Sequence, residues 1–422
     1  MIAGGAILAL YNGFLLLGAP FLAIKKAIKF GRRGHAHEWD APRWNAPQTL
    51  PGQGKRVVFV GLSWGEVGVL HEISRRLEAD FLDIEILWSI RDQAAQQMAR
   101  ERFPNRKILP MPFDFAIATR NWLEAVRPDV LVVVEKFWWP NLVWGAKLRG
   151  AKVVLVNGRS RGRDKTRYKL LSSFQEWILS AFDLLLFESE AQIERVRAVL
   201  PRGAKIEATG NVKFGFEAPL PPPDAPALEK WLAEINAPLL IAGSTASIDE
   251  KWALDAFEKV RIETRCVLLI APRRIQRAEE IAAEIESRGL KVSRRSAPVG
   301  GAEVMILDTM GELSYAYRWG VAAYVGGAVE GRGHNIIEPL AHGIAASYGP
   351  NRGDFESVQR AAEALEVGFR VHSADELADF WRRALADGAW RKAIAARAAH
   401  LIAQNGGALE RVVALLGEEI SR

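Results

Sequence analysis

The chain has 422 residues, of which 49% are hydrophobic and 25% are charged, a balance that excludes an intrinsically disordered protein. Its length allows two domains, each with a core of its own. Lys and Arg (56) outnumber Asp and Glu (50), so the formal net charge of +6 favours anionic partners. The single cysteine, Cys266, begins an apolar run and excludes both a disulfide framework and a thiolate metal site.

The first 24 residues predict contact with a membrane. No charged residue lies between Ile2 and Ile24, and a basic cluster from Lys25 to Arg33 follows. About twenty apolar residues can cross a bilayer as a helix, and a basic flank stays on the cytoplasmic side. Because the charges follow the apolar run, a cleaved signal peptide is disfavoured. We therefore expect a membrane anchor and basic linker at 1–50, with membrane contact through residues 2–33.

The nature of this anchor stays open at the level of the sequence. Several glycines and Pro20 weaken a long helix, and Asn12 is polar, so a half-inserted interfacial segment competes with a spanning one. A buried core helix is a third alternative, although such helices seldom run this long without a charge. In the first two cases the rest of the chain is expected on the cytoplasmic side of the membrane.

Residues 51–216 predict a first Rossmann-like domain. Apolar runs typical of buried strands alternate with helical patterns, the first of which spans 66–78. Continuous apolar strands separated by helices indicate a parallel sheet covered on both faces. The predicted strands are 56–60, 84–88, 130–134, 153–156 and 184–187.

A proline-rich segment interrupts this alternation. Residues 217–225 contain four prolines, which exclude a helix or a central strand, so we predict a hinge there. A second Rossmann-like domain is predicted at 226–387, followed by closing helices at 388–422. Its predicted strands are 239–242, 267–270, 304–307 and 321–325. The fold class is therefore α/β with two doubly wound domains, which bind ligands in a cleft at the carboxyl ends of their strands.

The turn after the first strand holds a candidate catalytic carboxylate. Residues 61–68 are rich in glycine, and Glu66 falls in the first turn of the next helix. A sugar hydroxyl is a poor nucleophile at neutral pH, so a carboxylate that accepts its proton is the simplest catalyst. The alternative is that Glu66 only interacts favourably with the helix dipole.

A second turn, at residues 326–335, predicts an anion site. Its glycines allow close approach, and Asn335 with Glu338 forms a plausible capping pair at a helix start. Free amides at such a helix end suit a nucleotide phosphate, and Arg332 and His334 can add positive charge. The alternative is a glycine-rich loop with a purely structural role.

Further cations and hydroxyls follow other predicted strands. Arg273 follows the strand at 267–270, Lys213 precedes the hinge, and Ser244 with Thr245 ends the first strand of the second domain. Basic residues at strand ends are more often solvated at the surface than bound to a ligand. This set therefore indicates a binding site only if its side chains lie together in one cleft. The histidines and aspartates show no metal-ligand spacing, so we expect neither a structural nor a catalytic metal.

Several short motifs together resemble one family of enzymes, the bacterial Kdo (3-deoxy-D-manno-octulosonic acid) transferases. The similarity extends over most of residues 50–355. The motifs are Ser63-Trp64-Gly65-Glu66, Trp139-Pro140-Asn141-Leu142, Val154-Leu155-Val156-Asn157, Gly210-Asn211-Val212-Lys213-Phe214, Pro272-Arg273, Asp308-Thr309-Met310-Gly311-Glu312-Leu313 and Gly333-His334-Asn335 with Glu338-Pro339. The resemblance implies a GT-B glycosyltransferase that inverts configuration while moving Kdo from CMP-Kdo to a lipid A precursor. It implies no metal, no other cofactor and no nucleic-acid partner.

The resemblance also implies roles for particular residues. Glu66 is the expected general base. The side chains and loop expected to bind the donor are Ser244, Thr245, Arg273, Gly326, Gly327, Arg332, Gly333, His334, Asn335, Glu338, Lys213, Met310 and Gly311. Those expected to bind the acceptor are Ser63, Gly65, Asn141 and Arg159.

The chain departs from the family pattern at three places in its first half. Phe137 stands where a second acidic residue is usual after Glu135, Val60 replaces a histidine, and Trp88 begins a strand end that is usually rich in threonine. One residue is also missing before Gly333. A different sugar or acceptor, or an inactive membrane-surface homologue, therefore stays open. A nucleotide-sugar epimerase has the same architecture, but that class gives no reason for an anchor.

Overall fold

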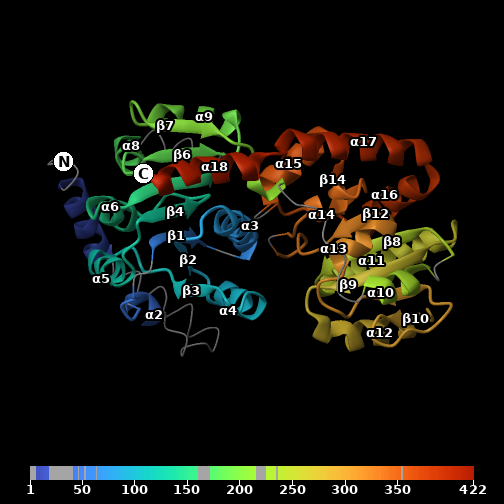
Figure 1. The fold of residues 1–422 in the computed structure, drawn as a ribbon. Coiled ribbons are helices and arrows are strands. Elements are labelled where there is room, and N and C mark those ends of the chain that lie inside the picture. The colour runs from blue at the N-terminus through green and yellow to red at the C-terminus, as the bar shows by residue number, and fades with distance from the viewer. Residues whose placement is uncertain are drawn as a thin grey trace. The chain divides into compact units, whose positions relative to one another are not determined.

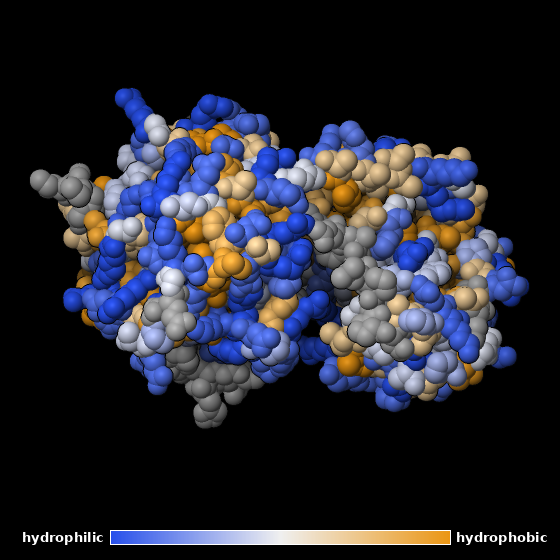
Figure 2. Space-filling model, viewed as in Figure 1, coloured by the Kyte–Doolittle hydropathy of each residue, from blue (hydrophilic) through white to orange (hydrophobic). Residues whose placement is uncertain are grey.

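The computed structural model contains two compact units. Unit 1 comprises Met1–Lys213 and Gly407–Arg422, and unit 2 comprises Phe214–Gly406 (Figure 1). Hydrophilic residues cover most of the visible surface of both, with apolar residues in patches between them (Figure 2). The structure describes residues 6–18, 41–45, 47–51, 54–62, 64–159, 172–214, 225–233, 236–331, 333–352 and 355–422. The predicted hinge at 217–225, except for its last residue Ala225, and the basic cluster after Ile24 lie outside these ranges.

Unit 1 is built on a parallel sheet of seven strands in the order β3-β2-β1-β4-β5-β6-β7. The register pairs Val57 with Ile86 on one side and with Val130 on the other. The chain builds the sheet outward from β1 in one direction and then outward from β4 in the other, so β1 and β4 form the topological switch point. The strands are β1 Lys55–Gly61, β2 Ile84–Ile90, β3 Lys107–Pro110, β4 Val130–Val134, β5 Lys152–Gly158, β6 Leu184–Phe187 and β7 Lys205–Ala208.

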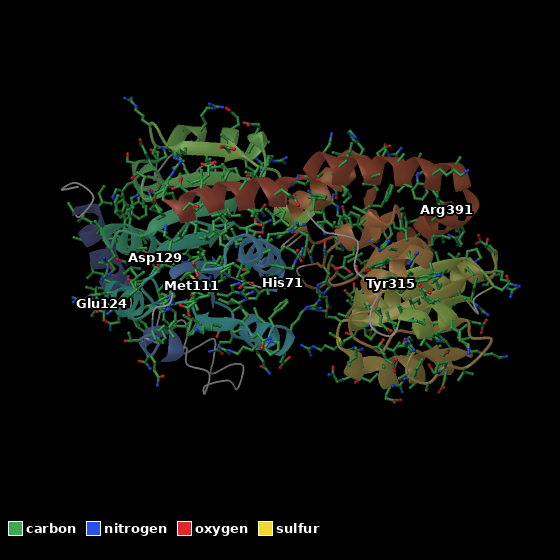
Figure 3. The ribbon with its side chains drawn as sticks, viewed as in Figure 1. His71, Met111, Glu124, Asp129, Tyr315 and Arg391 are labelled. Atoms are coloured by element: carbon green, nitrogen blue, oxygen red, sulfur yellow. The ribbon has the colours of Figure 1, made fainter. Side chains whose placement is uncertain are left out.

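Helices cover both faces of this sheet because its strands are apolar on both sides. Val57 and Phe59 face the core under α3, α4 and α18, whereas Val58 and Val60 face the core under α5, α6 and α8. His71 of α3 stacks on Phe103, with ring centroids 4.4 Å apart (Figure 3). The helices are α2 Ala41–Trp44, α3 Trp64–Asp80, α4 Gln93–Arg102, α5 Ala116–Val126, α6 Pro140–Leu148, α8 Ser172–Leu179, α9 Glu190–Val196 and α18 Ala408–Ser421, with short 3₁₀ turns at Arg197–Val199 and Val212–Phe214.

Unit 2 repeats this architecture with a parallel sheet of seven strands in the order β10-β11-β9-β8-β12-β13-β14. Its switch point lies between β8 and β12, where Ile241 is in register with Ala323. The strands are β8 Leu239–Thr245, β9 Val267–Pro272, β10 Val292–Arg294, β11 Val304–Ile306, β12 Gly320–Val325, β13 Ala346–Tyr348 and β14 Gly368–Arg370. The helices are α10 Ala225–Ala233, α11 Ser247–Arg261, α12 Ala278–Ser287, α13 Leu313–Ala316, α14 Ile337–Ala341, α15 Glu356–Ala364, α16 Ala374–Ala386 and α17 Gly388–Asn405, with 3₁₀ turns at Ile275–Arg277 and Tyr317–Trp319.

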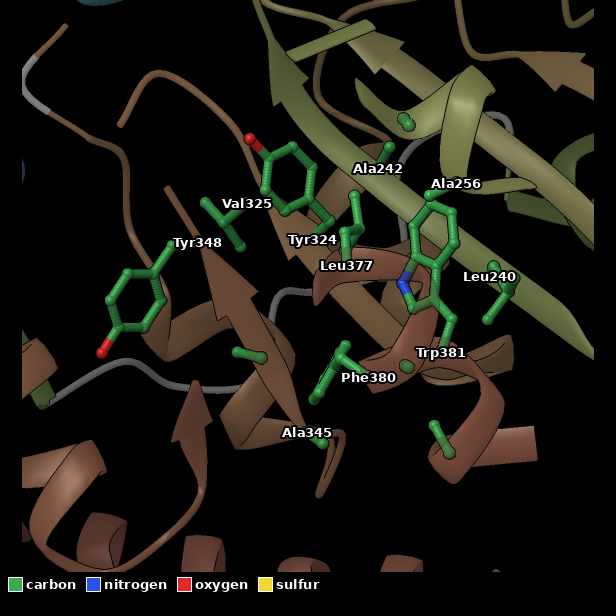
Figure 4. Close-up of a cluster of buried hydrophobic side chains, with 14 of the residues drawn as sticks. Leu240, Ala242, Ala256, Tyr324, Val325, Ala345, Tyr348, Leu377, Phe380 and Trp381 are labelled. Atoms are coloured by element: carbon green, nitrogen blue, oxygen red, sulfur yellow. The ribbon is translucent and has the colours of Figure 1, made fainter. Parts of the chain in front are cut away.

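The core of unit 2 is well filled around its central strands. Leu240 and Tyr324, from β8 and β12, lie in the same buried cluster as Trp381 of α16 (Figure 4). The predicted closing helices at 388–422 are divided between the units. Trp390 of α17 packs in unit 2, whereas Leu416 of α18 is buried in unit 1. The sequence pattern predicts the two helices but not the unit that each one covers.

Residues 6–18 form a helix in unit 1, beside α5 and α6 (Figure 1). Among the residues that the structure describes, no helix combines the length and the hydrophobicity needed to cross a bilayer. The remainder of the predicted anchor, residues 2–5 and 19–33, lies outside the described ranges.

Candidate functional site

Glu66 lies at the switch point of unit 1, in the first turn of the helix that follows β1. Its side chain is only 3% exposed, and its carboxylate accepts a hydrogen bond from the backbone N–H of Leu62. The pKa of Glu66 is raised to about 7, mainly by burial and also by the negative charge of Glu135. The Leu62 hydrogen bond, Lys136 and Lys213 oppose this rise. A carboxylate that titrates near neutral pH is suited to accept a proton during catalysis.

Glu135 forms the second half of this site, directly after β4. Its backbone adopts the left-handed conformation with φ of 64°, which is costly for a residue with a side chain. The buried carboxylate is ion-paired with Arg159 at 2.7 Å and with Lys213 at 2.6 Å. Burial alone raises the pKa of Glu135, but Lys213 and Arg159 outweigh it and hold that pKa below its ordinary value. Glu135 is therefore ionised beside Glu66.

The segment that carries Lys213 is held by side chains of the neighbouring strands. Asn157, at the end of β5, accepts a hydrogen bond from the backbone N–H of Val212 at 3.1 Å. Asn211 accepts from the backbone N–H of Lys213 at 3.0 Å and donates to Glu188 at 3.0 Å. These contacts fix Lys213 on unit 1, at the carboxyl edge of its sheet.

The structure places the four predicted acceptor residues in different environments. Arg159 belongs to the site because it binds Glu135, and Gly65 lies in the first turn of α3. Asn141 does not point to an open site: its amide donates to Asn12 and to the backbone carbonyl of Asp114, at 3.0 and 2.7 Å. These contacts give Asn141 a structural role, and its assignment to the acceptor stays a prediction. Ser63 lies outside the described residues.

The three departures from the family pattern are buried. Val60 and Trp88 have no exposed surface, and Phe137 is 1% exposed and stacked on Trp138. The indole N–H of Trp88 donates to the hydroxyl of Ser74 at 2.9 Å. The departures therefore change the packing of the unit 1 core rather than its surface.

In unit 2, the predicted phosphate loop lies at the switch point between β8 and β12. A Cβ atom on Gly326 would lie 2.8 Å from both the carbonyl oxygen of Ser244 and the Cα of Thr245, so only glycine fits there. Ser244, at the end of β8, has a positive φ of 54°. The backbone N–H of Arg273 donates to the carbonyl of Thr245 at 2.9 Å. Ser244, Thr245, Gly326 and Arg273 are thus brought together by the sheet.

Asp249 organises this loop, although the sequence reasoning missed it. Its carboxylate accepts hydrogen bonds from the backbone N–H groups of Gly327 at 2.8 Å and Ala246 at 2.9 Å, and from the hydroxyl of Tyr324 at 2.7 Å. The feature of the sequence that could have indicated Asp249 is its position in the first turn of α11, the helix that follows β8. Its partners come from β12 and the loop after it, which are remote in sequence.

His334 lies against Gly327 but does not supply the positive charge expected of it. A Cβ atom on Gly327, where φ is +79°, would lie 2.6 Å from the His334 ring. Burial, together with the nearby charge of Arg273, lowers the pKa of His334 to about 4. The imidazole is therefore neutral near pH 7, so it can bind a donor only as a hydrogen-bonding or packing group.

Asn335 and Glu338 contact each other at the end of the loop, but they do not form the predicted cap, because the N-cap of α14 is Ile336 and no side chain caps the helix. Asn335 accepts from the backbone N–H of Ile337 at 3.0 Å and donates to Glu338 at 3.5 Å. Because α14 has only five residues, its helix dipole is small, and the loop amides are the better anion donors. Gly333, with φ of +71°, belongs to the same loop, and Arg332 lies outside the described residues.

The motif at 308–313 lies in the connection between β11 and α13 of unit 2. Thr309 donates to the carboxylate of Glu312, which is ion-paired with Arg295 at 3.0 Å. The predicted capping box does not form, because the N-cap of α13 is Glu312 and no side chain caps the helix. Met310 is exposed, and Gly311 has a φ of +84°. The assignment of Met310 and Gly311 to the donor stays a prediction.

Comparison with known proteins shows which family the chain resembles. The family model described as 3-deoxy-D-manno-octulosonic-acid transferase (kdotransferase) matches residues 31–216. The 3-deoxy-D-manno-octulosonic acid transferase of Bordetella pertussis is 29% identical over 313 residues, which cover 72% of each chain. That of Haemophilus influenzae is 24% identical over 429 residues, 98% of this chain and 95% of the relative.

A solved structure gives the fold independently. A glycosyltransferase from Rickettsia africae has a TM-score of 0.55 and 14% sequence identity, covering 87% of this chain and 99% of its own. This likeness supports two parallel-sheet α/β units of the GT-B kind. The sequence relatives confirm the resemblance given by the motifs: the chain is similar to the Kdo transferases, which are glycosyltransferases.

Proposed function

We propose that this protein is an inverting glycosyltransferase that moves Kdo from CMP-Kdo to a lipid A precursor during lipopolysaccharide biosynthesis. One observation carries the proposal: Glu66 is buried at the switch point of unit 1 with its pKa raised to about 7. Relatives named as 3-deoxy-D-manno-octulosonic acid transferases supply the sugar and the reaction type.

In the proposed reaction, Glu66 acts as the general base. It accepts the proton of an acceptor hydroxyl as that oxygen bonds to the anomeric carbon of Kdo. The bond between that carbon and the CMP phosphate oxygen breaks on the opposite face, so the configuration inverts and CMP leaves as a phosphate monoester. Proton transfer of this kind contributes about 10²- to 10⁴-fold to a rate.

The donor is proposed to bind at the switch point of unit 2. Backbone amides of the loop that includes Gly326 and Gly327, the hydroxyls of Ser244 and Thr245, and the charge of Arg273 would bind the phosphate of CMP. Asp249 already occupies the backbone N–H of Gly327. The phosphate would therefore bind to other amides of the loop.

Lys213 and Arg159 have a different proposed role from the one that the motifs implied. Both are paired with Glu135 in unit 1. We propose that this cluster, with two cations around one carboxylate, sets the charge around Glu66 and attracts the carboxylate of Kdo. Binding of that carboxylate would compete with Glu135 for the same cations.

We also propose that the enzyme needs no metal and works at the cytoplasmic face of the inner membrane. Among the described residues, no three His, Cys, Asp or Glu side chains are grouped to hold an ion. The uncharged run from Ile2 to Ile24, followed by basic residues, supports membrane contact through residues 2–33. Activity is expected to be unchanged in EDTA.

The proposal is tested by incubating the purified protein with CMP-Kdo and a lipid A precursor. CMP release together with a lipid heavier by one or more Kdo units supports it. Glu66→Gln is expected to abolish both signals, whereas Glu72→Gln, on the exposed side of the same helix, keeps them. CMP-Kdo left intact would reject this donor, and a second CMP-activated acidic sugar then distinguishes an altered donor from an inactive homologue.

A further inference from the structure

The helix at residues 6–18 is bonded to unit 1 through polar side chains at its middle. The hydroxyl of Tyr11 donates to the carboxylate of Asp114 at 2.9 Å. Asn12 and Asn141 exchange two amide hydrogen bonds, at 2.8 and 3.0 Å. We call these four residues the polar joint. Paired amides with fixed partners define one orientation of the helix, whereas apolar packing alone would tolerate several.

Asp114 links this joint to α6. Its carboxylate also accepts hydrogen bonds from the backbone N–H groups of Leu142 at 2.9 Å and Asn141 at 3.3 Å. These N–H groups lie in the first turn of α6, where they have no hydrogen-bond acceptor within the helix itself. All of these hydrogen bonds join residues of unit 1. The first helix is therefore attached to the connection that follows Glu135 along the chain, and is a fixed part of the unit.

The opposite side of the same helix is apolar and exposed. Leu10, Phe14 and Leu17, at the spacing of one helical face, are 69%, 79% and 84% exposed. Leu8 and Tyr11, on the other side, contact unit 1. Large side chains of this kind rarely stay in water together, and the space-filling view shows apolar residues along this edge of unit 1 (Figure 2).

Two further exposed apolar side chains lie close to the polar joint. Trp44 of α2 packs on Phe113 and Phe115, which flank Asp114, with ring centroids 4.8 and 5.0 Å apart. Trp44 is 45% exposed, and Ile117, at the start of α5, is 75% exposed. The apolar surface therefore includes side chains from three elements of unit 1.

We propose that residues 6–18 are an in-plane anchor, fixed to unit 1 by the polar joint, whose exposed face lies with Trp44 and Ile117 in the interfacial layer of an anionic bilayer. This rests on the proposed membrane association and specifies its geometry. The basic residues from Lys25 to Arg33 follow in the sequence and complement anionic head groups. A helix bonded at its middle to Asp114 and Asn141 cannot turn to cross the bilayer without taking both into hydrocarbon.

Spin labels on the full-length chain test this geometry. In a Cys266→Ala background, single cysteines replace Leu10, Phe14 or Leu17, and Leu82, which is 93% exposed in unit 1, serves as the aqueous control. The protein is bound to vesicles of phosphatidylethanolamine and phosphatidylglycerol, and label depth is measured from collisions with oxygen and with a polar nickel complex. Labels at 10 and 17 are expected at equal depth in the interface. A crossing helix would separate them by about 10 Å, from its rise of about 1.5 Å per residue.

The possible results separate this inference from the proposed function. If the protein does not bind the vesicles at all, the membrane association itself fails. If it binds but the labels at 10 and 17 differ by about 10 Å in depth, or stay in water, only the in-plane anchor is overturned. Phe14→Ser is expected to lower vesicle affinity about tenfold or more, because one large apolar side chain leaves the lipid, whereas Leu82→Ser leaves it unchanged.

Discussion

Glu135 and Lys213 form a buried ion pair, with 2.6 Å between Oε1 and Nζ, at the carboxyl edge of the unit 1 sheet. Because Glu135 raises the pKa of Glu66 and Lys213 lowers it, the pair acts on the proposed base from both directions. Lys213 is thus part of the environment of the base. The effect of each charge on the pKa of Glu66 can be tested separately, because replacing Glu135 leaves the charge of Lys213 in place and replacing Lys213 leaves that of Glu135.

The pH dependence of kcat/KM is expected to show the state of Glu66. A base works when deprotonated, so kcat/KM should rise with pH through about 7. Glu135→Gln removes a negative charge and should move this rise to lower pH. Lys213→Gln removes a positive charge and should move it to higher pH. Steady-state rates between pH 5 and 9 measure the shifts, and two shifts of the same sign would contradict the assignment.

Glu66 is also expected to destabilise unit 1 at high pH. Its folded pKa of about 7 lies above the ordinary value of 4.5, so its contribution to stability is present below pH 4.5 and is lost as pH rises through 7. Glu66→Gln removes this pH-dependent loss of stability, because glutamine does not titrate. The variant should therefore gain up to about 3 kcal/mol relative to wild type at pH 8, and little at pH 4.5. Urea unfolding at both values measures this, and an equal effect at the two pH values would reject the raised pKa.

Gly326 is expected to be irreplaceable in the donor loop. In Gly326→Ala the new methyl group meets the backbone of Ser244 and Thr245 at 2.8 Å, and backbone atoms cannot move aside cheaply. We expect a loss of about 1–3 kcal/mol in stability and a clear loss of CMP affinity. Calorimetric titration with CMP measures the latter. Gly300→Ala is the matched control, because nothing lies within 4 Å of its Cβ position and both properties should be retained.

The neutrality of His334 can be tested separately. Because its pKa is lowered to about 4, the imidazole keeps the same charge between pH 5.5 and 8. His334→Asn should therefore change CMP affinity by the same factor at both ends of this range. A loss confined to the acidic end would mean that a charged imidazole binds the phosphate.

The polar joint predicts coupling between Asn12 and Asn141. Each single change to Ala leaves one amide without its partner, whereas the double variant removes both. The coupling free energy in a double-mutant cycle is expected at about 1–2 kcal/mol. Thermal unfolding of the four proteins measures it, with Asn12→Ala and Gln97→Ala as an uncoupled control pair. Strict additivity of Asn12 and Asn141 would contradict the joint.

The sequence determined the local features of this protein. Fully buried parallel strands read as unbroken apolar runs, so β4 (130–134) and β6 (184–187) were predicted with their observed bounds. Short strands with charged residues were missed, such as β3 and β7, which begin with Lys107 and Lys205. Glu66 and the loop at 326–335 were found because each directly follows a strong strand signal.

Only the tertiary structure decided which distant residues meet. The order of strands places Glu66 beside Glu135, and pairing with Lys213 and Arg159 fixes the charge of that carboxylate. The neutrality of His334 likewise depends on burial and on a charge that is remote in sequence. A residue type gives only an ordinary pKa. The actual value follows from desolvation and neighbouring charges, and these exist only once the chain has folded.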